Sequence, residues 1–247
     1  MNIAREVRTA RTALAAVGSA ERARGEKRYL KSELKFLGAP MPEIRRVTRE
    51  LANRVKAEDD ASLRPLCSAL WDTGVHELRA IAMLVLERRA DVLGARDLTL
   101  LERLLRESKS WAYLDWISIK VLAPMLPRVP AVRRKVARWS RDRDFWMRRA
   151  AVLILLPGVK DGIVPFSAFE AIAVPMLGER EFFIRKALGW GLREVGKRRP
   201  GDVAAFLRAH RGEVSGLTLR EGVKYLPARD RRDLLGAAHP RRRARRA

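Results

Sequence analysis

The sequence predicts an all-α protein in which short helices stack as a repeating array. Ala, Leu, Arg and Glu dominate the chain, and no alternating run of Val, Ile and Thr indicates a β-strand. Helix-breaking residues come singly or in short clusters, so the segments between them have helical length. These breakers lie at Gly38–Pro42, Pro65, Gly74, Pro124–Pro130, Pro157–Gly158, Pro200–Gly201 and Pro227.

A degenerate repeat is the second observation behind this fold class. An apolar residue followed by a charged one recurs with steps of 34, 36, 33, 37 and 35 residues. Small and aliphatic residues follow at helical spacing, so each unit is expected to bury a face on its neighbours. Tetratricopeptide signatures are absent, and we expect a right-handed superhelical solenoid of about six HEAT-like helical pairs. The pairs are Ile44–Arg45, Leu78–Arg79, Leu114–Asp115, Met147–Arg148, Ile184–Arg185 and Leu219–Arg220.

In chain order, the first element is the Arg-rich amphipathic segment 1–17, which we expect to be a helix of the domain rather than a transit peptide. The repeat domain is expected to cover residues 1–239. The last residues, 240–247, hold five arginines and nothing to bury, so they predict a disordered basic tail. Such a tail would add non-specific affinity for DNA, although it also resembles a localisation signal.

Composition and charge limit the classes of function. The net charge is +23 and the pI is near 11.4, which favours a polyanionic partner. The single cysteine, Cys67, excludes an intramolecular disulfide and a multi-cysteine zinc site, suits a reducing cytosol, and is expected to be buried. The three histidines show no metal-ligand spacing, and no apolar run has the roughly 20 residues that span a bilayer.

Asp115 breaks the pattern of the repeat. Five of the six repeats place Arg after the apolar anchor, and only the third places an acid there. If these positions share one face, a concave basic groove would follow a phosphate backbone, which carries about one charge per 1.7 Å of duplex. The alternative is that the arginines lie along helix flanks and pair with neighbouring Glu. The arginines concerned are Arg45, Arg79, Arg148, Arg185 and Arg220.

Trp111 and Asp115 are the chemically suggestive pair. Their four-residue spacing places them on one face of a helix, which Ser108 or Ser110 could cap. A carboxylate beside an aromatic wall can stabilise a cation such as an alkylated base or an oxocarbenium ion. The alternative for a lone Asp is a salt bridge, for instance to Arg149. Trp116 points about 100° away and is expected in the core.

Trp190 is expected in the middle of a helix with glycine on both sides. Glycine is unfavourable inside a helix, so Gly189 and Gly191 indicate that another backbone or a DNA strand approaches closely. Core packing is the alternative for this indole.

Several blocks together resemble the AlkD-like DNA glycosylases, a DNA alkylation repair family built from HEAT-like repeats. The most specific block is Phe182–Trp190 with Leu192–Arg193–Glu194, and the others occur in the family's order along most of the chain. These others are Arg28–Lys31, Phe36–Gly38, Pro42–Arg46, Leu70–Asp72, Glu77–Ala80, Lys109–Trp111 with Asp115, and Phe145–Ala151. The chain departs from the family at Ala112 and Tyr113, where members often carry a second aromatic and a second acid.

The resemblance implies a monofunctional glycosylase that excises cationic N3- or N7-alkylated purines from duplex DNA without metal or organic cofactor. By motif, it implies that Asp115 is the catalytic carboxylate and that Trp111 and Trp190 contact the deoxyribose of the lesion. Arg149 would hold the backbone, and Tyr29 would be a further groove contact. A monomer in a bacterial-type cytoplasm, associated with the nucleoid, is expected.

Two other functions remain open from the sequence. One is a non-catalytic HEAT-like protein that binds damaged or branched DNA by shape and charge. The other is a scaffold whose basic face meets an acidic protein.

Overall fold

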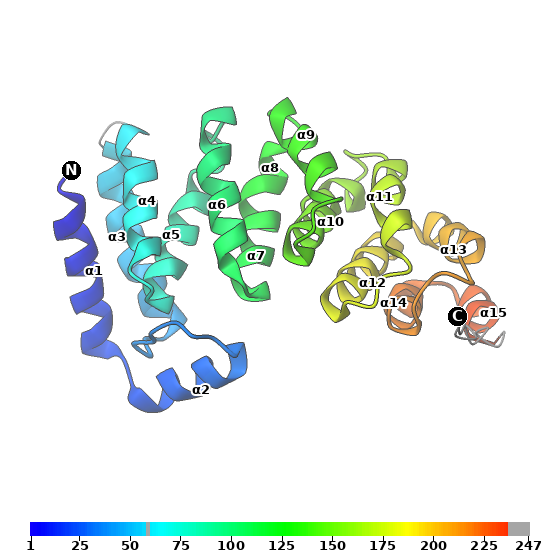
Figure 1. Ribbon diagram of the computed structural model, residues 1–247, viewed down its shortest axis with the longest axis horizontal. Helices are drawn as coiled ribbons and strands as arrows, with labels where there is room; N and C mark the ends of the chain where they lie inside the picture. Colours follow the sequence, from blue (N-terminus) through cyan, green and yellow to red (C-terminus); the bar gives the residue numbers. More distant parts are fainter. Residues whose placement is uncertain (58–59, 237–247) are drawn as a thin grey trace. The chain divides into compact units, whose positions relative to one another are not determined.

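The computed structural model describes residues 1–57 and 60–236, and every regular element in these ranges is helical (Figure 1). The β-type pairing in this part of the chain is an isolated bridge between Lys35 and Val75. The chain folds as two compact units, the first ending at Val132 and the second beginning at Arg133. The all-α prediction is therefore confirmed. The predicted tail, 240–247, lies outside the described residues.

The first unit contains the N-terminal repeats. Helix α1 packs on α3 and α4, α4 packs on α5, and α6 packs on α7. Helix α7 continues as a π-helical segment, Ile117–Leu122. The helices are α1 (Ile3–Val17), α2 (Ala20–Leu30), α3 (Met41–Ala57), α4 (Leu63–Asp72), α5 (His76–Arg88), α6 (Leu98–Ser108), α7 (Trp111–Trp116) and α8 (Ala123–Met125), and α9 (Pro130–Trp139) begins here.

The second unit repeats the same plan. Helix α10 packs on α11 and α12, and α12 packs on α13 and α14. Its helices after α9 are α10 (Phe145–Lys160), α11 (Phe166–Ala173), α12 (Phe182–Gly196), α13 (Pro200–Ala209), α14 (Gly216–Gly222) and α15 (Ala228–Gly236).

The six apolar anchors of the repeat are all buried, and each is the third or fourth residue of a helix. The helices that carry them stack on one another: α3 on α5 and α5 on α7 in the first unit, then α10 on α12 and α12 on α14 in the second. This arrangement confirms the predicted stacked helical pairs. The handedness of the superhelix and its concave groove stay predictions.

The most apolar helices form the centre of each unit. Helix α5 buries nine of its residues and α10 buries eleven, because apolar side chains occupy nearly their whole circumference. Cys67 is also buried, as expected, with its thiol near the carbonyl of Ala82. None of the described helices is both long and apolar enough to cross a bilayer.

One buried carboxylate holds the segment that joins α2 to α3 in place. Glu77, which is fully buried, accepts hydrogen bonds from the backbone N–H groups of Leu37, Gly38 and Ala39 at 2.6–3.3 Å. Gly38 has φ +76°, and a Cβ there would lie 2.0 Å from the carbonyl oxygen of Ser19. Only glycine therefore lets this segment pass so close to the start of α2.

Candidate active site

Helix α7 begins at a sharp turn that sets the position of Trp111. Lys109 ends α6 with φ +43°, and the extended Ser110 then caps α7 by accepting a hydrogen bond from the N–H of Ala112 at 3.3 Å. Ser108, the other predicted cap, instead donates to the carbonyl of Leu104 within α6. Trp111 is thus the first residue of α7.

Three of the predicted site residues gather in the first unit. Trp111 and Asp115 are half-buried, and their spacing places both on one face of α7. The ring of Tyr29, from the end of α2, meets the indole of Trp111 edge to face with centroids 6.0 Å apart. Tyr29 is 73% exposed. An accessible aromatic pair therefore lies at the start of the helix that carries the carboxylate.

Tyr113 holds α7 from the opposite side. Its buried hydroxyl lies 2.5 Å from Nδ1 of His76, and its ring meets Trp71 edge to face at 5.5 Å. The indole of Trp71 donates to Glu107 at 2.8 Å, and the guanidinium of Arg79 lies 4.3 Å from the centroid of its ring. Burial raises the pKa of the Tyr113 hydroxyl, so this group stays neutral. These contacts fix the rotation of α7 and hence the direction of Asp115.

This supporting cluster is absent from the sequence-based prediction. From the sequence, Tyr113 is a departure from the family pattern and His76 is a histidine without metal-ligand spacing. Both lie next to family blocks, but nothing in the sequence pairs them across 37 residues.

The prediction that Trp116 lies in the core is wrong. It is half-buried rather than in the core, because its indole N–H donates to Glu87 at 2.7 Å and keeps one edge near the surface. The π-helical segment starts directly after it. Such segments are rare and often lie at functional sites.

In the second unit, Trp190 lies in the middle of α12, as predicted, and is half-buried. The glycines beside it serve packing. A Cβ on Gly189 would lie 2.7 Å from Cβ of Glu221 in α14, and a Cβ on Gly191 would lie 2.7 Å from the ring of Phe169. Of the two predicted partners, another backbone or a DNA strand, the neighbour at Gly189 is the protein's own helix α14.

Arg148 and Arg149 are both held by protein groups. Arg149 is 4% exposed and donates to the carbonyl of Phe183 at 2.7 Å. Arg148 donates through two nitrogens to the carboxylate of Glu179 at 2.7 and 2.8 Å. Arg148 therefore has the paired arrangement that the sequence had left open as the alternative.

The other arginines of the predicted stripe differ in their surroundings. Arg45 and Arg220 are exposed, whereas Arg185 is half-buried with a buried Nε that lacks a hydrogen bond in the described part of the chain. Arg79 donates to the carbonyl of Trp71 at 3.1 Å besides lying over its ring. Of the five arginines, Arg45 and Arg220 are exposed and the other three are half-buried.

Comparison with known proteins identifies the family of this all-helical chain. The model of the DNA alkylation repair enzyme family matches residues 10–226. This chain belongs to that family. The match confirms the resemblance that the sequence motifs indicated and gives the protein a role as an enzyme in the repair of alkylation damage, with DNA as its substrate.

A solved structure supports the fold of this family member. A predicted DNA alkylation repair enzyme from Enterococcus faecalis superposes with a TM-score of 0.77 at 21% identity, covering 85% of this chain and 97% of its own. No curated protein matches the sequence. At this identity the likeness concerns the fold alone.

Proposed function

We propose that this protein is a DNA glycosylase that hydrolyses the N-glycosidic bond of cationic N3- or N7-alkylated purines in duplex DNA. The observation that carries the proposal is the arrangement on α7, where Asp115 follows Trp111 by one helical turn and Tyr29 packs against that indole at 6.0 Å. Membership of a DNA alkylation repair family supplies the substrate class.

Hydrolysis of the glycosidic bond of a cationic purine needs one well-placed anion and little else from the protein. An alkylated purine already carries a positive charge, so it leaves as a neutral base without a strong general acid. Positive charge then develops at C1′ of the deoxyribose, where the carboxylate of Asp115 would stabilise it. Trp111 and Tyr29 would add attraction for the cation through their ring faces. Water adds to C1′ and loses a proton, which completes the hydrolysis.

The second unit is proposed to contribute DNA contacts through Trp190 and, more weakly, through Arg149, which is 4% exposed and donates to the carbonyl of Phe183. Arg45 and Arg220 would meet the backbone directly, since both are exposed. Arg79, Arg148 and Arg185 are proposed as weaker contacts, because protein groups already surround them. We expect the protein to act as a monomer and to associate with the nucleoid through its charge of +23.

The decisive experiment is a base-release assay on methylated duplex DNA. We expect release of free 7-methylguanine or 3-methyladenine, and a loss on the order of 10²-fold or more for Asp115→Asn, the size of effect that follows removal of one preorganised electrostatic group. Affinity for undamaged DNA should change by less than about twofold, since Asn preserves the shape of the side chain.

Asp91→Asn is the matched control, because it removes an exposed carboxylate from the same unit without touching α7. It should release base at the wild-type rate. Wild-type protein that binds DNA but releases no base would contradict the proposal and would indicate a binding protein that recognises damaged DNA by shape and charge.

A further inference from the structure

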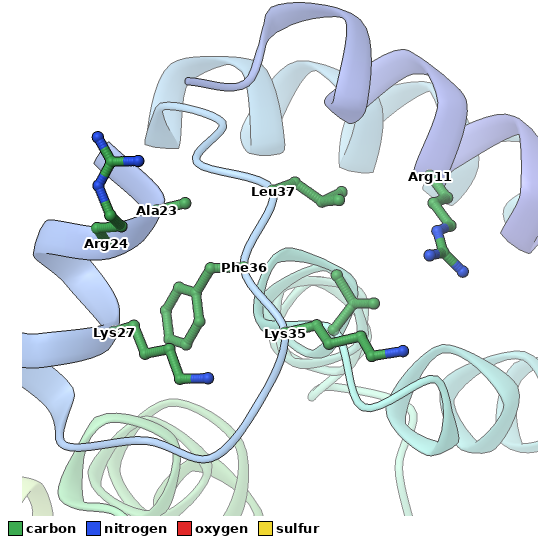
Figure 2. Close-up of a pocket in the computed structure, with 8 residues that line it drawn as sticks. Arg11, Ala23, Arg24, Lys27, Lys35, Phe36 and Leu37 are labelled. Atoms are coloured by element: carbon green, nitrogen blue, oxygen red, sulfur yellow. The ribbon is translucent and has the colours of Figure 1, made fainter. Parts of the chain in front are cut away.

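The first unit contains a basic cavity apart from Trp111 and Asp115. It has a volume of about 440 Å³, within the range of roughly 300–1,000 Å³ usual for ligand pockets. It lies between α1, α2 and the segment that leads from α2 to α3 (Figure 2). The residues around it are Arg11, Ala23, Arg24, Lys27, Lys35, Phe36, Leu37 and Val75.

The charge around this cavity has a single sign. It is lined by four cationic side chains and no carboxylate. None of the four has an ion pair or a side-chain hydrogen bond with any residue in the described part of the chain, although Arg22 on the same helix α2 pairs with Glu26 at 3.2 Å. Arg11 and Lys35 form no ion pair with any described residue, and like charges held near one another repel, so an anion bound between these two side chains would be stabilised.

The apolar side of the cavity is held rigidly. Phe36 stacks on His76 with ring centroids 4.4 Å apart and planes 14° apart, yet it remains half-exposed. The backbone of Lys35 is fixed at both ends, since its N–H donates to Gly74 at 3.0 Å and its carbonyl accepts from the N–H of His76 at 2.8 Å. The aromatic ring and the backbone that carries the Lys35 side chain are thus positioned before any ligand arrives.

Figure 2 shows on which side of the segment between α2 and α3 each lining side chain lies. Arg11 and Lys35 point toward one another on one side of the segment, Lys27 lies beside the ring of Phe36, and Arg24 points away from it. The cavity therefore combines a cationic part made by Arg11 and Lys35 with an aromatic part made by Phe36.

We propose that this cavity binds one nucleotide unit of a single DNA strand outside the lesion. Arg11 and Lys35 would hold its phosphate, because an arginine fork and a lysine ammonium both suit phosphate oxygens. The base would lie against Phe36, since stacking on an aromatic ring accepts any base. The choice of DNA as the source of the nucleotide rests on the proposed function, whereas the ligand chemistry rests on the cavity itself.

The test is the affinity of the full chain for a fluorescein-labelled tetrathymidylate, measured by anisotropy. Replacing both cations, Arg11→Gln with Lys35→Gln, should weaken binding on the order of tenfold through the loss of two phosphate contacts. The matched control, Arg5→Gln with Arg8→Gln, removes the same charge from exposed positions of α1 outside the cavity. It should weaken binding by less than about twofold. Equal losses in the two variants would overturn the proposal.

Two further arms test the base and the source of the nucleotide. Phe36→Leu should weaken binding of the tetrathymidylate but not of an abasic tetramer with the same charge, whereas Phe36→Tyr should bind both normally. Equal weakening of both probes by Phe36→Leu would overturn the role of the base. Free thymidine monophosphate should compete poorly with the tetramer, and competition equal to that of unlabelled tetramer would overturn a DNA strand as the source.

Base release keeps this inference separate from the proposed function. Asp115→Asn should lose base release and still bind the tetramer with wild-type affinity, because Asp115 does not line the cavity. The tetramer carries no lesion, so its binding stays informative even if the protein releases no base.

Discussion

Helices α2 and α12 each carry an aromatic residue that we assign to DNA, but the two helices are held in opposite ways. Helix α2 has no buried residue and bears Tyr29, which is 73% exposed. Helix α12 buries eight of its fifteen residues and bears Trp190 between two closely packed glycines. The position of Tyr29 on α2 therefore depends on the few hydrogen bonds that hold the segment between α2 and α3. The position of Trp190 on α12 depends on packing in the core.

The largest expected change in stability comes from replacing Glu77, the carboxylate that holds the segment between α2 and α3. Glu77→Ala removes the acceptor of three backbone N–H groups, of which those of Gly38 and Ala39 are buried and that of Leu37 is part-buried. Because hydrogen bonds to charged groups contribute about 1.5–3 kcal/mol each, with imperfect additivity, we expect the free energy of unfolding to fall by about 3 kcal/mol. Urea unfolding measures the loss, and amide exchange at Leu37, Gly38 and Ala39 should accelerate.

The control is Glu33→Ala, which removes an exposed carboxylate from the same segment. It should leave both readouts within experimental error. If the two variants behave alike, Glu77 does not anchor α2, and the contrast between the two helices fails.

The second effect tests the tight packing of α12. Gly189→Ala places a Cβ 2.7 Å from Cβ of Glu221 and 3.2 Å from Cα of Thr218. Glu221 has little freedom to withdraw, since it pairs with Arg193 and with Lys224. Overpacking costs about 1–3 kcal/mol, and the better helix propensity of Ala offsets about 1 of these. We expect a net loss of about 1 kcal/mol by thermal unfolding, and a stabilised variant would contradict it.

The two helices also show what could be predicted from sequence. The central place of Trp190 in α12 follows from helical spacing within one element and is predicted from the sequence. The Trp111–Asp115 register follows from the same rule. The contact of Tyr29 with Trp111 and the bonds of Glu77 depend on how separate elements stack, because the partners of Glu77 lie up to 40 residues away. Spacing along one chain does not encode such pairings.

A third effect concerns the pH dependence of stability and involves His76, which packs against the segment that follows α2. Burial lowers the pKa of His76, which contacts Phe36 and Tyr113. The unfolded chain, with a pKa near 6.5, then binds a proton that the folded chain excludes, so stability is lost as pH falls below about 6.5. The slope is at most about 1.4 kcal/mol per pH unit.

Urea unfolding of the wild type and of His76→Gln between pH 7.5 and 5 measures this slope. The variant should lose part of the decline. A wild-type slope unchanged by His76→Gln would show that this histidine is not the group that titrates.

The smallest expected effect is an increase in stability, and it comes from replacing a glycine in α2. Gly25 lies in the middle of α2, and a Cβ built there meets no atom within 4 Å. Gly25→Ala therefore brings the helix propensity of Ala without a clash, and we expect the free energy of unfolding to rise by about 0.5–1 kcal/mol. The same substitution would thus stabilise the exposed helix and destabilise the packed one.

Because Tyr29 is one turn away from Gly25, the variant also tests whether a stiffer α2 alters base release. A thermal melt measures the change in stability, and the base-release assay measures the change in activity. Destabilisation by Gly25→Ala would mean that α2 is packed more closely than its exposed residues indicate, and the distinction from α12 would not hold.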